Sequence, residues 1–169
     1  DKRGDEIWLL SHKPVFTLGQ AADRKNILDP GNIPVIDIDR GGQVTYHGPG
    51  QLVAYILLDI RKRRMSVRDL VSALESSMVN ALSHFGISAQ TRPKAPGVYV
   101  NEAKIGALGL RIKNGKSYHG LSLNVDMDLA PFSKINPCGF ENLEVTQMSE
   151  YIDPSKFLMR DCSEILSKK

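Results

Sequence analysis

Residues 33–60 read IPVIDIDRGGQVTYHGPGQLVAYILLDI and combine two strand patterns with a glycine-rich connection. The first part, 33–40, alternates apolar and polar side chains, which predicts a strand. The last part, 51–60, is almost continuously apolar and includes β-branched and aromatic residues, which predicts a strand covered on both faces. Four glycines and a proline surround His47 between them. The backbone of this connection is therefore suited to close approach by a ligand.

The glycine spacing excludes two common nucleotide-binding patterns. Neither G-x-G-x-x-G nor the Walker motif, with its lysine and hydroxyl residue, is present. A hairpin with tight turns would explain the glycines, although it would leave Arg40 and His47 unexplained. We therefore expect a short strand over 43–47, a turn at 48–50 and a ligand close to the Gly41–Gly42 pair.

Strand patterns precede and follow this stretch. Residues 7–19 contain two apolar runs separated by Lys13-Pro14, as two short strands with a turn between them would. Strand-like segments recur at the following residues: 97–100, 103–112 and 117–125. Asn114-Gly115 is a strong hairpin signal between the last two.

Two segments have the apolar periodicity of helices. In 66–86 the apolar residues fall at helical spacing, Ser66 with Asp69 resembles a capping box, and Gly86 supplies a stop. A second helix is predicted from Pro154 or Ser155 to about Ser167. Hairpins, one long helix and an apolar central strand together predict an α+β fold with a mixed sheet.

Length and composition favour one domain. The chain has 169 residues, of which 41% are hydrophobic, enough for one well-packed core over residues 1–169. No apolar run is long enough to cross a bilayer, and the charged N-terminus lacks a signal segment, so we expect a cytoplasmic protein with no membrane association. The net charge of +3 comes from mostly interspersed residues, which does not indicate nucleic-acid binding. The exception is Arg61–Arg64, a solvated turn or a site for an acidic protein.

Two cysteines are the only thiols. Cys138 lies in an irregular NPCGF turn that is suited to present a thiol to a cleft, whereas Cys162 lies in the predicted C-terminal helix and is expected to pack. A lone cysteine needs a neighbour that ionises it. Lys104 is the candidate, since Gly106 and Gly109 follow it and would admit a ligand, although sequence spacing alone does not bring Lys104 to Cys138. The scattered histidines and cysteines lack metal-ligand spacing, so no metal is expected.

Several motifs together resemble one family. RGGQVTYHGPGQLVAY, GVYV, AKIGALGLRI, HGLSLNV and NPCGF occur in this order between residues 7 and 151, as in the lipoyl (octanoyl) transferases. The resemblance implies a biotin/lipoate ligase-like domain with a central mixed sheet flanked by helices. Family members usually carry a further strand and helix before residue 7, so we expect this sequence to lack that segment.

The resemblance also implies an activity and a site. Such enzymes move an octanoyl group from acyl carrier protein to a lysine of lipoyl domains through a cysteine thioester, without a cofactor. It places the thioester on Cys138 and the activating amine on Lys104. It places the substrate at three segments: Arg40, Gly41, Gly42, Gln43, Val44, Thr45, Tyr46 and His47; Ala107, Leu108 and Gly109; Gly120, Leu121 and Ser122.

Partners and further roles follow from the same resemblance. The expected donor is octanoyl-acyl carrier protein, the acceptors are lipoyl domains of 2-oxoacid dehydrogenase complexes and the glycine cleavage H protein, and we expect a monomer. Both partners are typically acidic, so a basic rim is predicted, with Arg61–Arg64, Arg92 and Lys94 as candidates. His47 either orients the reacting groups or is a turn histidine, and His119 is a weaker candidate.

Two alternatives stay open from the sequence. An ATP-dependent lipoate or biotin ligase has the same fold and a related glycine-rich stretch, but it forms an adenylate and needs no thiol. NPCG argues against that activity. A non-catalytic acyl-binding module would use the glycines to shape a pocket while Cys138 only packs.

Overall fold

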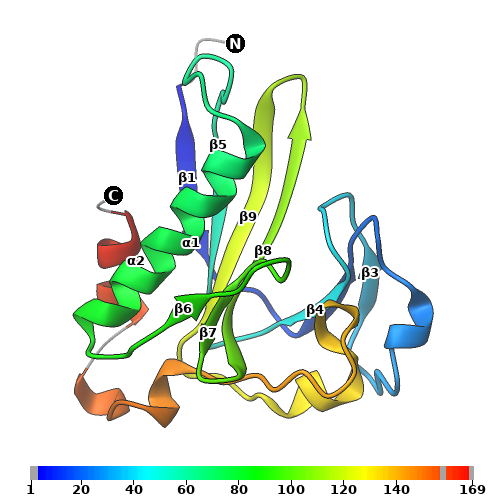
Figure 1. Ribbon diagram of the computed structural model, residues 1–169. Coiled ribbons are helices and arrows are strands. Elements are labelled where there is room, and N and C mark those ends of the chain that lie inside the picture. The colour runs from blue at the N-terminus through cyan, green and yellow to red at the C-terminus, as the bar shows by residue number, and fades with distance from the viewer. Residues whose placement is uncertain (1–3, 157–158, 168–169) are drawn as a thin grey trace.

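Strands dominate the chain. The computed structural model describes residues 4–156 and 159–167, and these ranges contain two sheets and two α-helices (Figure 1). The strands are β1 (Glu6–Leu10), β2 (Val15–Leu18), β3 (Val35–Asp37), β4 (Val44–His47), β5 (Gln51–Leu57), β6 (Gln90–Thr91), β7 (Val98–Val100), β8 (Ala103–Lys113) and β9 (Lys116–Asn124). The α-helices are α1 (Val67–His84) and α2 (Met159–Ser167). Short 3-10 turns are η1 (Arg24–Asn26), η2 (Ala130–Lys134), η3 (Pro137–Gly139), η4 (Met148–Glu150) and η5 (Pro154–Lys156).

The two sheets differ in strand direction. The large sheet has the order β1-β5-β9-β8-β7-β6, and every neighbouring pair is antiparallel. The small sheet has the order β3-β2-β4, in which β2 runs parallel to β3 and antiparallel to β4. The predicted α+β fold with mixed strand directions is confirmed, and the parallel pairing lies in the small sheet.

The two strands predicted in residues 7–19 both form, but they do not pair with each other. Leu10 at the end of β1 is opposite Val53 in the large sheet, whereas Phe16 in β2 is opposite Tyr46 in the small sheet. Residues 11–14 therefore cross between the sheets rather than closing a hairpin. The reason is burial, since Phe16 is completely buried in a second core with Tyr46.

The predicted hairpin at Asn114-Gly115 is confirmed. It joins β8 to β9 with Lys113 opposite Lys116, and both turn residues have positive φ, 52° and 77°. Asparagine and glycine adopt this conformation more readily than other residues do, which fixes the register of the two longest strands.

β5 lies between β1 and β9 and is buried over most of its length, as its continuous apolar run predicted.

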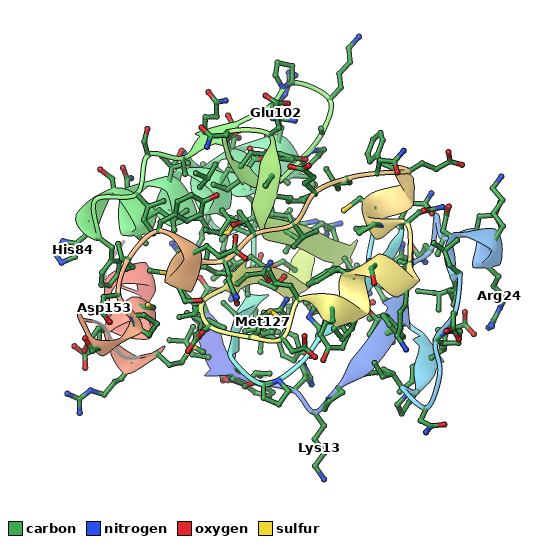
Figure 2. All side chains as sticks on the ribbon, turned by 90° about the horizontal axis from the view of Figure 1, so that it is seen from below. Lys13, Arg24, His84, Glu102, Met127 and Asp153 are labelled. Carbon is green, nitrogen blue, oxygen red and sulfur yellow. The ribbon has the colours of Figure 1, made fainter. Side chains whose placement is uncertain are left out.

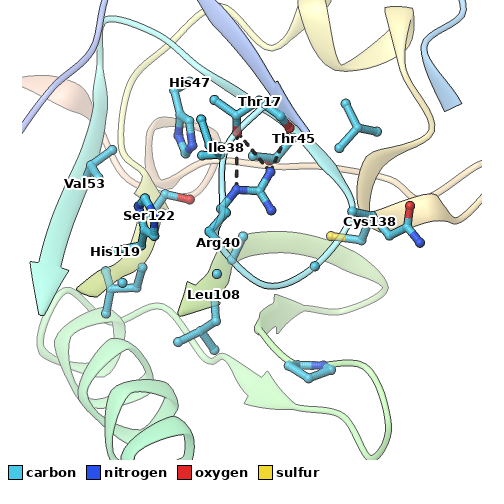
Figure 3. Close-up of a pocket in the computed structure, with 18 of the residues that line it drawn as sticks. Thr17, Ile38, Arg40, Thr45, His47, Val53, Leu108, His119, Ser122 and Cys138 are labelled. Atoms are coloured by element: carbon cyan, nitrogen blue, oxygen red, sulfur yellow. Dashed lines mark hydrogen bonds between the residues drawn. The ribbon is translucent and has the colours of Figure 1, made fainter. Parts of the chain in front are cut away.

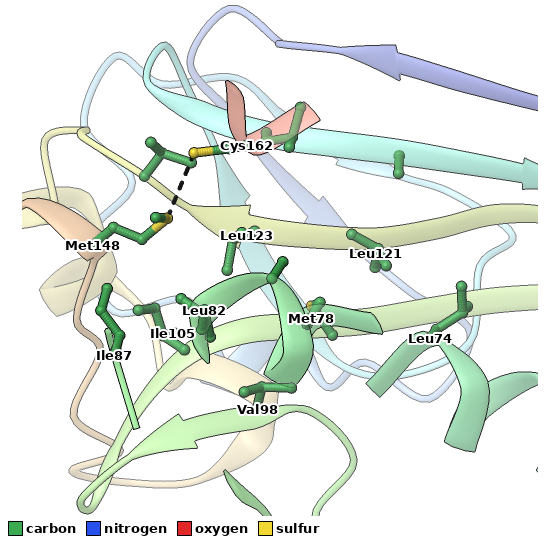
Figure 4. Close-up of a cluster of buried hydrophobic side chains, with 14 of the residues drawn as sticks. Leu74, Met78, Leu82, Ile87, Val98, Ile105, Leu121, Leu123, Met148 and Cys162 are labelled. Carbon is green, nitrogen blue, oxygen red and sulfur yellow. Dashed lines mark hydrogen bonds between the residues drawn. The ribbon is translucent and has the colours of Figure 1, made fainter. Parts of the chain in front are cut away.

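Helix α1 covers one face of the large sheet. Its predicted capping box between Ser66 and Asp69 forms, and Gly86 follows its end with φ of 77°. The helix buries a stripe of side chains against the sheet (Figure 4). This main core includes Leu74, Met78 and Leu82 from α1 with Ile105, Leu121 and Leu123 from β8 and β9.

A second core lies under the small sheet. It combines side chains from β2, β4 and the segment that contains η2, including Phe16, Tyr46, Met127 and Phe132. Charged side chains such as Lys13 and Arg24 instead project away from the molecule, as Figure 2 shows. The face of the large sheet that α1 does not cover is therefore held opposite a small sheet that has its own core.

The C-terminal helix differs in its start from the sequence prediction. The described part of α2 begins at Met159, and η5 forms a separate turn at Pro154–Lys156, while residues 157–158 lie outside the described residues. Asp153 accepts a hydrogen bond from the backbone N–H of Ser155 at 2.9 Å, which stabilises that turn. Across residues 4–156 and 159–167, neither helix has the length and apolarity needed to span a bilayer.

Candidate active site

A cavity of about 390 Å³ lies between the two sheets. One wall comes from β5, β8 and β9, and the other comes from β2, β4 and the connection between β3 and β4. Cys138 and Lys104 both line this cavity, although 34 residues of chain separate them. Figure 3 shows the cavity with Arg40 crossing its middle.

Cys138 is held in a strained turn. Its φ is 57° in η3, between Pro137 and Gly139, which itself has φ of 78°. This left-handed conformation is uncommon for a residue with a Cβ atom. The turn is anchored to η1, because the backbone N–H of Asn136 donates to the carbonyl of Asn26 at 2.8 Å. The strain therefore presents the half-buried sulfur to the cavity.

Lys104 meets the sulfur of Cys138. Its Nζ lies 3.1 Å from Cys138 Sγ and donates to the carbonyl oxygen of Pro96 at 2.9 Å. The Tyr99 ring adds a cation–π contact, with Nζ 5.4 Å from the ring centroid. Lys104 is only 6% exposed, so this amine has little competition from water. An ammonium at hydrogen-bonding distance favours the ionised form of a thiol.

An irregularity in β8 gives Lys104 its direction. Tyr99 is opposite Lys104 while Val98 is opposite Gly106, so Ile105 is an extra residue in β8. Ile105 packs in the main core, and a Cβ on Gly106 would lie 2.7 Å from Met78 Sδ on the same face. Two successive residues therefore face α1, and Lys104 faces the cavity together with Ala107 and Gly109.

Gly97 makes room for the Lys104 side chain. A Cβ atom at Gly97 would lie 2.5 Å from Lys104 Cε and 3.0 Å from Nζ, and its φ is 133°. The backbone N–H of Gly97 donates to Glu75 Oε1 at 2.8 Å, which ties this loop to α1. Sequence reasoning missed this role, although the Pro96-Gly97 pair before β7 was a turn signal.

Arg40 is a buried cation in the cavity wall. It is 7% exposed, its Nη2 donates to the Thr17 carbonyl at 2.8 Å, and its Nη1 donates to the Gly41 carbonyl at 2.9 Å. Burial lowers the pKa of Arg40 to about 10, and the negative charge of ionised Cys138 acts in the opposite direction. The guanidinium therefore stays charged at neutral pH and adds positive potential near the sulfur.

His47 is neutral and fixed in orientation. Its Nδ1 lies 2.7 Å from Gln51 Oε1, while Gln51 Nε2 donates to Asn124 Oδ1 at 2.9 Å. Since the amide oxygen of Gln51 accepts, Nδ1 of His47 carries the proton. Burial lowers the pKa of His47 to about 4. Figure 3 places His47 on the opposite side of Arg40 from Cys138, so it lines the cavity without lying beside the sulfur.

Most of the predicted binding residues line this cavity. They are Arg40, Gly42, Gln43, Val44, Thr45, His47, Ala107, Leu108, Gly109, Gly120, Leu121 and Ser122. Two differ. Tyr46 points into the second core against Phe16 and Phe132, and Gly41 donates its backbone N–H to the carbonyl of Leu110 at 2.9 Å. Strand alternation in β4 explains Tyr46, because its neighbours Thr45 and His47 face the cavity.

The glycines of β8 and β9 have separate roles. Gly109 lies against Arg40, whose Cδ would be 2.8 Å from an added Cβ. Gly120 lies so close to β5 that an added Cβ would be 2.0 Å from the Ala54 carbonyl oxygen. Gly106, which the sequence suggested would admit a ligand, instead faces Met78 because of the extra residue in β8.

The basic candidates occupy different places. Lys94 lines the cavity, and Arg92 pairs with Glu102 at 2.7 Å and lies over the Tyr99 ring. Arg61–Arg64 lie between β5 and α1, at the end of the molecule near the N-terminus and away from β4 (Figure 1). Of these candidates, only Lys94 lines the cavity.

Cys162 is a packing residue, as the sequence predicted. It is 1% exposed, and its Sγ lies 3.8 Å from Met148 Sδ. Burial raises the pKa of its thiol to about 11, so it stays protonated. The described residues contain no group of three or more His, Cys, Asp or Glu side chains placed to hold a metal ion. The cavity therefore offers a thiol paired with an amine, which is an arrangement for nucleophilic catalysis.

Comparison with known proteins identifies a family model and relatives of similar sequence. The family model described as lipoyl protein ligase A/B catalytic domain matches residues 1–169. An octanoyltransferase of Pseudomonas fluorescens (strain SBW25) is 61% identical over 153 residues, covering 90% of this chain and 71% of the relative. One from Stutzerimonas stutzeri (strain A1501) is 60% identical over 151 residues, covering 89% and 69%.

Solved structures of similar fold give a second comparison. Lipoate-protein ligase A bound with ATP has a TM-score of 0.78 at 15% identity, covering 98% of this chain and 70% of that chain. A putative lipoate protein ligase from T. acidophilum has a TM-score of 0.77 at 15% identity, with the same coverage. The likeness confirms the lipoate ligase-like fold that the sequence motifs implied.

Proposed function

Because this chain belongs to the lipoyl protein ligase A/B catalytic domain family and, within it, to the octanoyltransferases, we propose that it transfers an octanoyl group from an acyl carrier protein to a lysine of a lipoyl domain. Cys138 is the nucleophile and Lys104 its activating amine. The observation that carries this assignment is the 3.1 Å separation of Lys104 Nζ and Cys138 Sγ at the cavity wall.

The first step loads the enzyme. The Cys138 thiolate attacks the carbonyl carbon of the donor thioester, a new C–S bond forms, and the donor sulfur leaves and takes up a proton. Exchange of one thioester for another is nearly balanced in energy, so no ATP is required. The Lys104 ammonium favours the thiolate, and the buried Arg40 adds positive charge from the opposite wall of the cavity.

The second step unloads it. The thiolate charge disappears when Cys138 is acylated, and an ammonium that is only 6% exposed is then disfavoured. Lys104 gives its proton to the departing donor sulfur and, as a neutral amine, becomes the base for the incoming lysine amine. That amine attacks the Cys138 thioester, an amide forms, the C–S bond breaks, and the thiolate and ammonium are restored.

A mass measurement tests the assignment. The protein is incubated with octanoyl-acyl carrier protein, denatured and weighed, and an octanoyl adduct that hydroxylamine removes is expected on Cys138. Cys162→Ala is the matched control and should load normally, whereas Cys138→Ala should not load. Incubation with lipoate and magnesium ATP tests the ligase alternative, in which an adenylate would form without an adduct on sulfur. Absence of any acyl adduct would leave an acyl-binding module as the better account.

The partners are part of the same proposal. We expect lipoyl domains of 2-oxoacid dehydrogenase complexes and the glycine cleavage H protein as acceptors, and we expect the chain to act as a monomer in the cytoplasm over residues 1–169 as one catalytic domain. Lys94 lines the cavity and is exposed, so it is the candidate for steering acidic partners. Lys94→Glu should slow association with the acyl carrier protein and weaken its dependence on salt, while Lys13→Glu serves as the control.

A further inference from the structure

The cavity has two ends. In Figure 3, Cys138 lies on one side of the Arg40 guanidinium, and Val53 and His119 lie on the other. The exposed side chain of Phe140, two residues after Cys138, also lines the cavity, so the cavity is open to solvent beside the sulfur. An acyl chain attached to Cys138 therefore extends past Arg40 toward Val53 and His119.

Three ring side chains meet at the far end. His12 comes from the crossover between β1 and β2, Tyr55 from β5 and His119 from β9, and all three line the cavity. His12 Nε2 lies 2.8 Å from the Tyr55 hydroxyl, and the Tyr55 and His119 ring centroids are 6.1 Å apart. We call these three residues the end wall.

His119 reaches the end wall through an unusual backbone. Its φ is 58° within β9, where Leu121 packs in the main core as well as lining the cavity, and Gly120 lies on the cavity. Regular alternation would direct His119 toward α1. Instead its Nε2 lies 2.9 Å from Asp39 Oδ1, and Tyr118 donates to Asp39 Oδ2 at 2.5 Å. A left-handed conformation is uncommon for a residue with a Cβ atom and persists where the surrounding structure holds it.

The end wall accepts an apolar chain end but resists a longer chain. Burial lowers the pKa of His12, so the ring is neutral at physiological pH, and the approach to the end wall passes Ile38 and Val53. A longer chain must separate the His12–Tyr55 hydrogen bond or displace His119 from Asp39. The His12–Tyr55 hydrogen bond is part-buried, and parting it without a replacement costs more free energy than burying one more methylene gains, whereas the exposed His119–Asp39 pair obstructs a longer chain by the position of the His119 ring.

We infer that His12, Tyr55 and His119 are specificity-determining residues that set the length of the acyl chain transferred. This inference rests on the proposed function, since it assumes that the chain is attached to Cys138. The end wall therefore limits the chain without contacting the reacting atoms.

Chain-length profiles test the inference. Single-turnover loading of Cys138 is measured by intact mass with hexanoyl, octanoyl, decanoyl and dodecanoyl thioesters. His119→Gly removes the ring and is compatible with φ of 58°, and the double variant His12→Ala/His119→Gly opens the end wall further. The ratio of dodecanoyl to octanoyl loading rates is expected to rise by about tenfold or more. His84→Ala, a histidine of α1 outside the cavity, should keep the original ratio.

Two outcomes distinguish a failure of the end-wall inference from a failure of the proposed function. An unchanged ratio in both end-wall variants, with octanoyl still loaded on Cys138, overturns the end wall and leaves the transferase intact. No adduct with any chain on the unaltered protein overturns the proposed function itself.

A second measurement uses the unaltered protein and does not depend on how the variants fold. An octanoyl thioester with a diazirine on its terminal carbon is loaded, illuminated and mapped by peptide mass. Crosslinks to peptides that contain Tyr55 or His119 support the end wall. Crosslinks confined to η3 or to residues 92–97 at the mouth overturn it.

Discussion

The two faces of the large sheet use the same strands for different purposes. The face under α1 presents an unbroken apolar set, with Ala54 of β5 beside Leu121 and Leu123 of β9. The opposite face presents Lys104 and Ser122 to the cavity. Alternation breaks at two places, at Ile105–Gly106, where two successive residues face α1 and Lys104 is left on the cavity side, and at His119. Chemistry is placed where the regular pattern is broken.

The two cysteines show the same contrast. Cys162 lies on the helix side, is almost fully buried, and its raised pKa keeps it protonated. Cys138 lies in a left-handed turn beside an amine. Reactivity therefore follows from the neighbours and exposure of each thiol rather than from the residue type.

Replacing each cysteine in turn by alanine should give the largest difference in octanoyl-transfer rate between a change on the cavity face and a change on the helix face. Cys138→Ala is expected to lower octanoyl transfer by about three orders of magnitude or more, because the nucleophile is lost. Cys162→Ala is expected to keep the transfer rate. Initial rates of octanoylation of a lipoyl domain provide the measurement, and equal rates in the two variants would remove the contrast.

Lys104→Met tests whether the cavity face needs a charge. The amine is proposed to act in both steps, so single-turnover loading and transfer should each slow by about 10²-fold or more. Lys13→Met, which changes an exposed lysine, is the control. Unaltered rates of both steps in Lys104→Met would refute the dual role.

Met78→Ala tests the helix face alone. Met78 is completely buried in the main core, so its truncation should lower the free energy of unfolding by about 2–5 kcal/mol. Denaturant titration measures this change. The loading rate at low temperature, where the variant is folded, should stay that of the unaltered protein; a large loss there would mean that the two faces are coupled.

Gly97→Ala tests the loop that joins α1 to the active site, because Gly97 contacts both Glu75 of α1 and the Lys104 side chain. The added Cβ would lie 2.5 Å from Lys104 Cε, so the amine must move from Cys138 Sγ. A displacement of about 1 Å is expected to slow loading by about tenfold to 100-fold. Gly86→Ala, which also has positive φ but nothing within 4 Å of the added Cβ, separates the backbone effect from the steric effect. Equal rates in the two variants would contradict the steric explanation.

His47 makes the cavity face sensitive to acid. Burial, opposed by the hydrogen bond to Gln51, lowers its pKa from 6.5 to about 4 in the folded protein. Between these values the unfolded chain binds a proton that the folded chain does not, so stability is present above pH 6.5 and is lost as the pH falls toward 4. The loss at pH 5 is about 2 kcal/mol. Comparing free energies of unfolding of the unaltered protein and His47→Gln at pH 7 and pH 5 should show a smaller decrease in the variant.

Local patterns determined much of the fold. The capping box at Ser66, the stop at Gly86 and the Asn114-Gly115 turn act between residues close in sequence, so the sequence alone predicted α1 and the β8–β9 hairpin. The continuous apolar run of β5 likewise predicted a central strand. Matching motifs identified the family and pointed to Cys138 and Lys104 as a pair.

Tertiary structure decided what those patterns left open. β1 and β2 separate into different sheets because Phe16 is buried in a second core, which no local turn signal encodes. The extra residue Ile105 and the left-handed His119 reverse the side-chain direction expected from alternation, and both depend on what packs against the strand. Sequence specified which residue types were available for chemistry; only long-range packing specified that an amine, a thiol and an end wall share one cavity, because contacts between distant segments fix those positions.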